Sequence, residues 1–280
     1  MNFESLKGKT VAASGCTGGL GRELCFYLAS LGAKIVMLNR NQKKSEYLIT
    51  EILGKYPETE ILNIIADMED INSVKSATEE LILQKPDVFI ANAGAYDIPR
   101  HICETGFDNV FQINFVSPYY IIKKLKEALP ETKIVAVGSI AHNYSKTNPD
   151  DIDFSCNKHA SKVYGNAKRH LMFSLLELFK DTPEKLAIVH PGISFTGITD
   201  HYPKIIFAII KHPMKIIFMK PKKATLSTLW GIYNHTPYPT WCGPWLFNVW
   251  GLPKLQKLNT CTPKESERVF KTAEKIFEGL

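Results

Sequence analysis

Short apolar segments alternate with longer amphipathic segments along most of the chain. The apolar segments are rich in β-branched residues, and the amphipathic ones repeat their apolar positions with helical spacing. The pattern predicts strands at 10–14, 34–38, 61–66, 87–91, 133–137 and 186–189, and helices at 20–31, 43–55, 71–85, 107–129 and 160–179. Strands that are apolar on both sides are typical of a parallel sheet with helices on both faces. We therefore expect an α/β fold built on a single doubly wound Rossmann sheet.

The alternation breaks down after Gly192, where the chain becomes bulky and rich in proline. We interpret 194–221 as a C-terminal substrate lid that precedes two closing helices, and residues 1–280 as one dinucleotide-binding catalytic domain. Part of the lid, 205–219, is basic and strongly apolar but too short to span a bilayer. It is expected to fold onto the substrate pocket or a subunit partner, with peripheral membrane contact as the alternative. The aromatic residues that crowd 230–250 are interpreted as core or interface.

Composition excludes several classes of function. The chain has 280 residues, is 45% hydrophobic and has a net charge of +6, but its lysines are scattered rather than gathered in the basic stripe of a nucleic-acid-binding protein. The six cysteines show neither the spacing of a zinc site nor that of a disulfide framework, so no metal is expected. The polar start lacks a secretory signal, which predicts a cytoplasmic location, with membrane-surface association as the variant that the lid allows.

A glycine-rich segment follows the first predicted strand and opens the first predicted helix. Glycines let the backbone turn tightly and approach a pyrophosphate, and the amino end of the following helix favours its negative charge. A glycine-rich turn without a ligand is the alternative. The position between a strand and a helix favours a dinucleotide site, with contacts from Gly15, Thr17, Gly18, Gly19, Leu20 and Gly21.

The type of cofactor is predicted from the end of the second strand. Asn39 and Arg40 stand there, where a carboxylate would hold the ribose hydroxyls of NAD. The Arg40 guanidinium is suited to phosphate oxygens, so NADP(H) is preferred over NAD(H). An arginine that is merely solvated at the surface is the alternative.

Two further segments at strand ends are candidate cofactor contacts. Asp67 is placed to accept from the adenine amino group, with a backbone contact from Met68, or alternatively to cap the following helix. Asn92, Ala93 and Gly94 follow the fourth strand, where small residues let the main chain pass close to a cofactor. Taken alone, this tripeptide would be interpreted as a turn.

Tyr164 and Lys168 lie four residues apart and therefore share one face of a predicted helix. A phenol is a poor acid at neutral pH, and a neighbouring ammonium is expected to lower its pKa toward the working range. Lys168 can also reach the ribose hydroxyls of a cofactor. The alternative is an aromatic ring packed under an aliphatic lysine stem.

Two polar residues support the catalytic interpretation of this pair. Ser139 ends the fifth strand, where its hydroxyl either donates to a substrate carbonyl oxygen or caps a turn. Asn114 is an unusual residue for the interior of a helix. We expect it either to hold a water that feeds protons to Lys168 or to satisfy a neighbouring backbone carbonyl.

Taken in order, these residues resemble the classical short-chain dehydrogenase/reductase family. The resemblance implies that Asn114, Ser139, Tyr164 and Lys168 form a catalytic tetrad. It also implies that Pro191 and Gly192 belong to the cofactor site, and that Ile193 and Thr196 close over the nicotinamide carboxamide. The motifs that carry the resemblance are Ser14-Gly15-x-x-x-Gly19-x-Gly21, Asp67, Asn92-Ala93-Gly94, Asn114, Ser139, Tyr164-x-x-x-Lys168 and Pro191-Gly192-x-x-x-Thr196.

The long spacing between Ser139 and Tyr164 is similar to that of the retinol dehydrogenase and WW-domain oxidoreductase branch. Small departures from the common pattern at Ser14, Ala91 and Ala167 leave the cofactor interpretation intact. The resemblance implies an NADP(H)-dependent oxidoreductase that interconverts a carbonyl and a primary or secondary alcohol on a steroid, retinoid or lipid-like substrate, with Tyr164 as general acid/base.

Three questions stay open at this stage. A catalytically silent NADPH-binding regulator or protein-interaction module on the same fold is the alternative function, and an isomerase or epimerase is a second one. The helices at 107–129 and 160–179 could pair in a homodimer, as the family often does, or be buried within one molecule. The individual substrate and the preferred direction of the reaction are not predicted.

Overall fold

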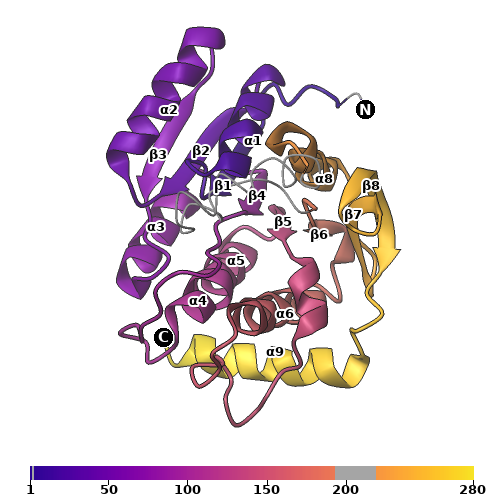
Figure 1. Ribbon diagram of the computed structural model, residues 1–280. Helices are drawn as coiled ribbons and strands as arrows, with labels where there is room; N and C mark the ends of the chain where they lie inside the picture. Colours follow the sequence, from indigo (N-terminus) through magenta and orange to yellow (C-terminus); the bar gives the residue numbers. More distant parts are fainter. Residues whose placement is uncertain (2, 193–218) are drawn as a thin grey trace, which may run out of the picture.

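The computed structural model describes residue 1, residues 3–192 and residues 219–280. Its strands form one sheet in the order β3-β2-β1-β4-β5-β6-β7-β8 (Figure 1). Neighbouring strands are parallel except for β7 and β8, which are antiparallel. The predicted α/β fold with a doubly wound sheet is therefore confirmed. The strands are β1 (Thr10–Ser14), β2 (Lys34–Asn39), β3 (Ile61–Ile65), β4 (Val88–Ala91), β5 (Lys133–Val137), β6 (Leu186–Val189), β7 (Thr240–Leu246) and β8 (Trp250–Lys257).

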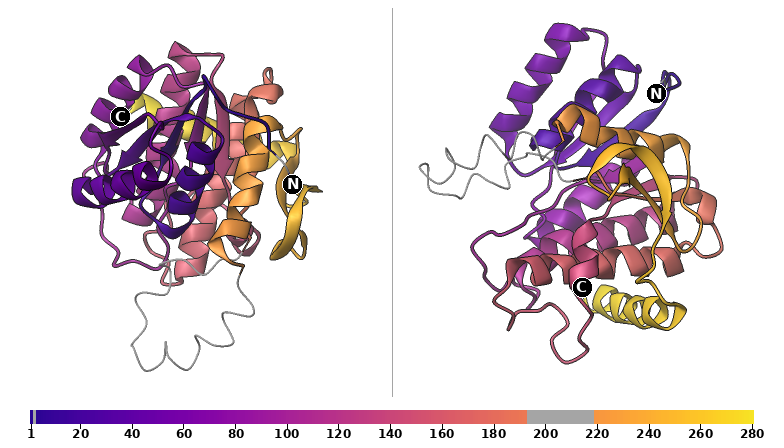
Figure 2. Two further views of the ribbon diagram at one scale, coloured as in Figure 1. Left: turned by 90° about the horizontal axis from the view of Figure 1, so that it is seen from above. Right: turned by 45° about the vertical axis from the view of Figure 1, so that its right-hand side comes forward.

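Helices cover both faces of the sheet (Figure 2). One layer contains α1 (Gly19–Ser30), α2 (Gln42–Lys55) and α8 (Pro221–Tyr233), and the other contains α3 (Ile71–Leu83), α5 (Ser117–Ala128), α6 (Ala160–Leu178) and α9 (Pro263–Glu278). Successive strand residues point to opposite faces, so Val11 and Ala13 pack in the first layer and Ala12 packs in the second. Because both faces are covered, ligands have access to the sheet at the carboxyl ends of its parallel strands.

The predicted helix at 107–129 is interrupted around Asn114. It consists of α4 (Asn109–Phe111), a π-helical turn (Gln112–Val116) and α5. A π-helical turn leaves the regular hydrogen-bond pattern and frequently lies at a functional site. Asn114 is buried within this π-helical turn, so its side-chain amide is not placed as it would be in a regular α-helix.

The C-terminal part differs from the prediction of two closing helices alone. Both helices are present as α8 and α9, but a β-hairpin of β7 and β8 lies between them, and β7 extends the sheet by pairing with β6. The strands escaped the sequence pattern because Pro244 and Pro253 interrupt them and because β8 is an edge strand with little burial. The aromatic residues at 230–250 are accordingly divided between the core, where Trp241 is buried, and the surface, where Trp245 is exposed.

α9 packs along α6 and ties the C-terminus to the second helical layer (Figure 1). Arg169 on α6 forms a two-pronged ion pair with Glu265 on α9, with two nitrogen–oxygen distances of 2.7 Å. α6 therefore packs against α9 within one molecule, and the pairing of helices in a homodimer stays a prediction. No helix among the described residues is both long and apolar enough to cross a membrane. The lid expected at 194–221 and its segment 205–219 lie outside the described residues, except for 219–221.

Candidate functional site

A cleft of about 760 Å³ lies at the carboxyl ends of β1 to β6. The catalytic candidates Ser139, Tyr164 and Lys168 line it, whereas Asn114 is fully buried and does not. Ile193 and Thr196 lie outside the described residues. A second cavity of about 630 Å³ at the amino ends of the strands contains none of the predicted site residues. The cofactor candidates that line the cleft are Gly15, Thr17, Gly18, Gly19, Leu20, Gly21, Asn39, Arg40, Asp67, Met68, Asn92, Ala93, Gly94, Pro191 and Gly192.

Two glycines of the loop between β1 and α1 have no room for a side chain. Gly15 has a φ of +69°, a conformation that favours glycine. A Cβ atom at Gly15 would lie 2.8 Å from the Ala93 Cα, and one at Gly21 would lie 2.2 Å from the carbonyl oxygen of Gly15. α1 begins at Gly19 with no acidic residue in its first turn, so its first amides and its dipole favour an anion. These features fit the pyrophosphate of a dinucleotide.

Two asparagines hold the glycine loop from behind. The Asn39 Oδ1 atom accepts from the backbone N–H of Cys16 at 2.7 Å and of Thr17 at 3.3 Å. The Asn92 Nδ2 atom donates to the carbonyl oxygen of Ser14 at 3.0 Å. Both side chains, which the sequence identifies as cofactor contacts, are thus used to fix the shape of the loop.

Arg40 lies at the mouth of the cleft, where its side chain is 67% exposed. One of its guanidinium nitrogens is 3.5 Å from a carboxylate oxygen of Glu69, and the other oxygen of Glu69 is 3.2 Å from His101 Nε2. Arg40 at the end of β2 is therefore paired with an acid from the loop after β3, a contact between distant residues that the sequence pattern does not indicate. An ion pair this exposed is weak, so a phosphate group can compete with Glu69 for Arg40.

Asp67 and Met68 follow β3 and line the cleft. The helix after them, α3, is capped by Asp70, whose Oδ1 atom accepts from the Ser73 N–H at 3.2 Å. The alternative in which Asp67 caps this helix is therefore wrong. Asp67 instead accepts from the Glu69 N–H at 3.1 Å, which keeps its carboxylate at the cleft.

Tyr164 and Lys168 lie together on α6. Lys168 is 2% exposed, and its Nζ donates to the Val137 carbonyl oxygen at 3.0 Å and lies 5.7 Å from the centre of the Tyr164 ring. Burial lowers the pKa of Lys168 to about 8. Burial also raises the pKa of Tyr164 to about 12, while hydrogen bonding to Ser139 acts in the opposite direction. The expected lowering of the tyrosine pKa by Lys168 is not found, because the amino group lies over the ring and desolvation dominates.

Ser139 and Asn114 make the backbone contacts that were the alternatives to their catalytic interpretation. The Ser139 Oγ atom accepts from the Ala141 N–H at 3.2 Å, which leaves its O–H able to donate elsewhere. The Asn114 Nδ2 atom donates to the carbonyl oxygens of Val110 and Ala95, both at 2.8 Å. Asn114 therefore satisfies two carbonyls and connects the π-helical turn to the loop after β4 that borders the cleft.

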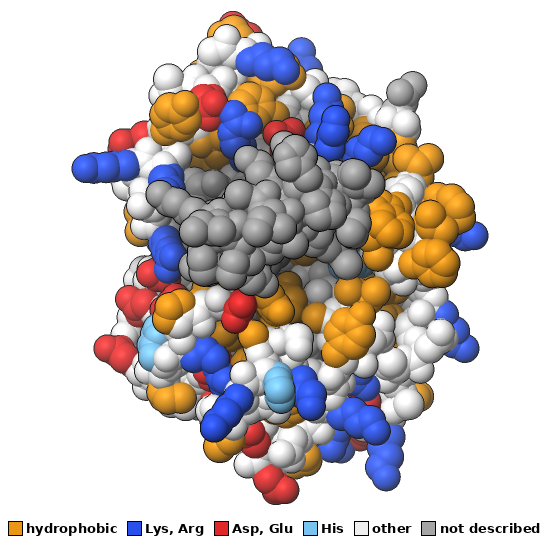
Figure 3. Space-filling model, in the orientation of Figure 1, with side chains coloured by type: hydrophobic (Ala, Val, Ile, Leu, Met, Phe, Trp, Pro, Cys, Tyr) orange, Lys and Arg blue, Asp and Glu red, His pale blue; other side chains and the backbone are white. Residues whose placement is uncertain are grey.

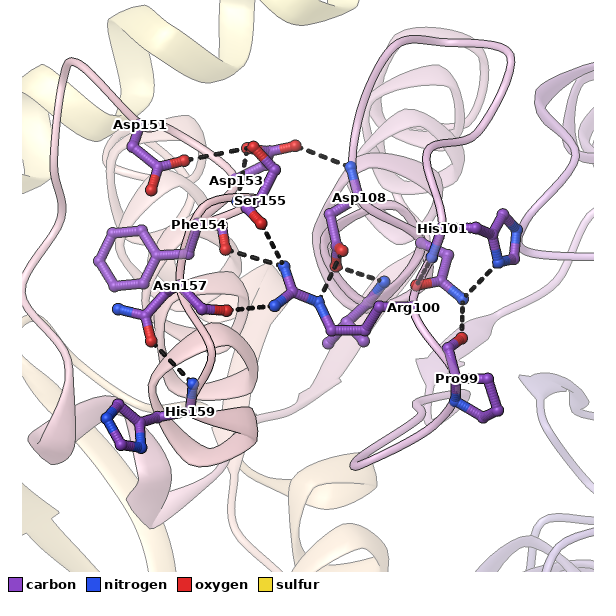
Figure 4. A network of polar contacts seen from close by, with 12 residues as sticks. Pro99, Arg100, His101, Asp108, Asp151, Asp153, Phe154, Ser155, Asn157 and His159 are labelled. Carbon is purple, nitrogen blue, oxygen red and sulfur yellow. Dashed lines mark hydrogen bonds and ion pairs between the residues drawn. The ribbon is translucent and has the colours of Figure 1, made fainter.

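Arg100 joins two long loops beside the cleft (Figure 4). Its Nε atom donates to Asp108 at 2.8 Å, and a second nitrogen donates to the Phe154 carbonyl oxygen at 2.8 Å. Further donors reach other carbonyls of the same loop. The Phe154 side chain packs with Val163, and Tyr164 packs against this group. Arg100 thus holds in place the loop that makes the serine-to-tyrosine spacing long, and with it one wall around the phenol.

Several cleft residues carry no signal in the sequence. The Tyr96 ring meets the Tyr164 ring edge-on, with ring centres 5.4 Å apart. Other side chains come from the loop after β4, the π-helical turn, the segment after β5 and the start of α6, and they follow neither a motif nor a period. Only their proximity in the chain to Gly94, Asn114, Ser139 or Tyr164 could have drawn attention to them. The missed residues include Tyr96, Ile98, Ile113, Ile140, Tyr144 and Ser161.

His190 lines the cleft at the end of β6, although the sequence assigns it no role. Its ring stacks on Trp241 of β7 at 5.0 Å, and its Nε2 atom lies 3.1 Å from the Asn248 carbonyl oxygen. His142 contacts the same indole edge-on, also at 5.0 Å. Burial lowers the pKa of both histidines to about 4, so both rings are neutral at physiological pH. No group of side chains in the described ranges is arranged to hold a metal ion.

The sequence matches known proteins over much of its length. Residues 9–170 match the family model for short chain dehydrogenases. Retinol dehydrogenase 12 of Mus musculus is 28% identical over 203 residues, which are 69% of this chain and 64% of that protein. Retinol dehydrogenase 14 of Homo sapiens is 28% identical over 218 residues, which are 70% of this chain and 65% of that protein. The chain thus spans less than two thirds of the length of these relatives.

Solved structures share the fold. An uncharacterized protein from Mycobacterium paratuberculosis has a TM-score of 0.78 at 19% identity, covering 99% of this chain and 96% of its own. Actinorhodin polyketide ketoreductase has a TM-score of 0.60 at 18% identity, covering 81% of this chain and 92% of its own. The family model matches more than half of the sequence and shows that the chain belongs to the short-chain dehydrogenase family.

Proposed function

We propose that the protein is an NADP(H)-dependent oxidoreductase that interconverts a carbonyl and a primary or secondary alcohol on a hydrophobic substrate. One observation carries the proposal: Ser139, Tyr164 and Lys168 line the same cleft as the glycine loop. A dinucleotide site and a proton donor in one cleft suit the delivery of a hydride and a proton to the same carbonyl group. Membership of the short-chain dehydrogenase family supports the same class of reaction.

Each catalytic candidate has a role that follows from its chemistry. Tyr164 is the general acid/base, and its pKa of about 12 keeps the phenol protonated at neutral pH, the form that donates to a carbonyl oxygen. The Ser139 hydroxyl donates to the same oxygen and stabilises the charge that develops on it. Lys168 brings a proton-bearing amine next to the phenol and would donate to a ribose hydroxyl of the cofactor. Asn114 acts as a positioning residue through the main chain that it holds.

The residues of the cleft fit a nicotinamide dinucleotide, because Gly15 and Gly21 let the loop pack tightly against its own backbone and the amides at the start of α1 favour a pyrophosphate. The loop amides would hold the pyrophosphate, Arg40 the adenosine phosphate and Asp67 the adenine. When bound, the cofactor supplies the hydride. The contribution of the chain is to bind it, orient it and keep a donor beside the substrate oxygen.

The apolar lining near Tyr164, formed by Tyr96, Ile98 and Tyr144, favours a hydrophobic substrate. The test is a panel of retinoids, steroids, aliphatic aldehydes and quinones, assayed with NADPH and with NADH by nucleotide absorbance and product mass. We expect turnover of at least one hydrophobic carbonyl, with NADPH preferred. Tight binding of NADPH without any turnover would instead support a silent regulator, and a rearranged product without net nucleotide consumption would support an isomerase.

Arg40→Ala is expected to weaken binding of NADPH by about tenfold or more, the effect of losing a charge-assisted contact to phosphate. Binding of NADH should be nearly unchanged, because it lacks this phosphate. Glu69→Gln should act in the opposite direction, because it frees Arg40 from its carboxylate partner. Fluorescence titrations with both nucleotides measure these effects, and Lys55→Ala at the far end of α2 is the control. Equal losses for both nucleotides would contradict the assignment of Arg40.

A further inference from the structure

The β7–β8 hairpin carries a concentration of exposed apolar side chains. Trp245 is 57% exposed, Phe247 77%, Leu252 55% and Leu255 41%, and we call these four side chains the hairpin surface. They surround the hairpin rather than share one of its faces, because Leu252 and Leu255 lie three residues apart on β8 and point to opposite faces. In Figure 3, apolar side chains gather on the side of the molecule where β7 and β8 lie. Large apolar side chains concentrated on one short element are typical of an interaction site.

Phe247 is held out from the molecule by an unfavourable backbone conformation. It lies at the tip of the hairpin with a φ of +53°, followed by Asn248 with a φ of +58°. Asparagine or glycine is the usual residue at such positions, and a bulky side chain is rare there. Since the ring is mostly exposed, the fold gains little from it. A partner into which this ring inserts would account for a bulky side chain at this place.

The stretch of sequence that contains the hairpin carries charges of one sign. From 220 to 264 the chain has six lysines and no aspartate or glutamate. Lys254 and Lys257 lie on β8 itself. Aromatic side chains combined with lysines are typical of segments that rest at the interface of a bilayer, where the rings enter the headgroup region and the ammonium groups meet anionic lipid. All six lysines are exposed: Lys220, Lys222, Lys223, Lys254, Lys257 and Lys264.

We propose that the hairpin surface docks the protein on a bilayer that contains anionic phospholipid. A second copy of the chain fits this surface less well. β8 is the edge of the sheet, but Pro253 lacks a donor for strand pairing, and Lys254 and Lys257 would face like charges across an edge-to-edge contact. A purely anionic partner such as a nucleic acid would leave Phe247 and Leu252 exposed.

The position of the hairpin gives the docking a consequence for substrate access. The Asn248 carbonyl contacts His190, and a Cβ at Gly192 would lie 2.8 Å from the Val249 carbonyl oxygen. The hairpin turn therefore adjoins residues that line the cleft, and a docked molecule would hold the cleft close to the headgroups. Direct uptake of an apolar substrate from the bilayer rests on the proposed function, whereas the docking itself does not.

The test is sedimentation of the full chain with vesicles of phosphatidylcholine, with and without about 30% phosphatidylserine. We expect clear binding to the anionic vesicles and at least about tenfold weaker binding to the neutral ones. The double variant Phe247→Ser/Leu252→Ser should lose about tenfold in binding to anionic vesicles. Lys254→Gln/Lys257→Gln should bind anionic vesicles more weakly, and the binding that remains should depend less on salt concentration than that of the parent. Because no substrate is present, this result is independent of whether the reaction is correctly assigned.

Matched controls carry the same changes elsewhere on the surface. Leu83→Ser on α3, where the side chain is 76% exposed, and Lys43→Gln/Lys44→Gln on α2 should bind like the parent. Thermal melting checks that each variant is folded. The proposal is overturned if the hairpin variants bind vesicles as the parent does, or if the parent binds none. It is also overturned if the parent is a dimer that the hairpin variants convert to monomers.

Discussion

Replacing Tyr164 with phenylalanine is expected to lower the rate of carbonyl reduction by about a hundred- to ten-thousand-fold, the usual contribution of a general acid. The variant loses only the hydroxyl, so the ring keeps its contact with Tyr96 and its packing on Val163. Binding of NADPH should stay close to the parent value, because the glycine loop is untouched. Single-turnover measurements of NADPH consumption and a nucleotide titration separate the two effects.

The matched control for this variant is Tyr47→Phe. It also removes one phenol hydroxyl, but from a side chain on α2 that is 69% exposed and does not line the cleft. Its rate should equal that of the parent. If Tyr164→Phe reduced its substrate at the parent rate, the proton would have to come from another group and the proposed role of Tyr164 would be lost.

Gly21→Ala is expected to abolish binding of either nucleotide, with a loss in affinity of about a hundredfold or more. The added methyl group would lie 2.2 Å from the Gly15 carbonyl oxygen and 2.7 Å from the Cys16 Cα, and both neighbours are backbone atoms that cannot simply rotate away. The loop must shift, which should also lower the free energy of unfolding by about 3 kcal/mol. Nucleotide titration and thermal melting report the two losses separately.

Gly54→Ala is the control for Gly21→Ala, because it adds the same methyl group at a position with free space. Gly54 lies in α2, and a Cβ there would meet no atom within 4 Å. Alanine favours the helix more than glycine does, so this variant should gain about 0.5 kcal/mol in stability and keep its nucleotide affinity. If Gly21→Ala behaved in the same way, the loop would not be the close-approach site inferred from its geometry.

The sheet and the position of the glycine loop could be predicted because both depend on local rules. Buried parallel strands are short and apolar, and the glycine loop must fall between the first strand and its helix. The spacing from Tyr164 to Lys168 likewise requires only that both lie on one helix. These features depend on residues close together in the sequence, so their positions could be deduced without knowledge of distant contacts.

The features of the site and the fold that could not be predicted depend on contacts between distant parts of the chain. Glu69 reaches Arg40 from another loop, and the burial that raises the pKa of Tyr164 arises from the packing of several elements. The stacking of His190 on Trp241 joins two strands that the sequence pattern did not connect. β8 also broke the expected alternation, because an edge strand with an exposed apolar surface resembles neither a buried strand nor a polar loop.

The contact of Trp241 with both His142 and His190 has a consequence for the biosynthesis of the protein. The indole belongs to a strand synthesised about a hundred residues after His142, and contacts between such distant residues form late in folding. While the chain emerges from the ribosome, the glycine loop can assemble early, but the far wall of the cleft must wait for the hairpin. A nascent chain that stops before Trp241 would leave both imidazoles without their shared aromatic neighbour.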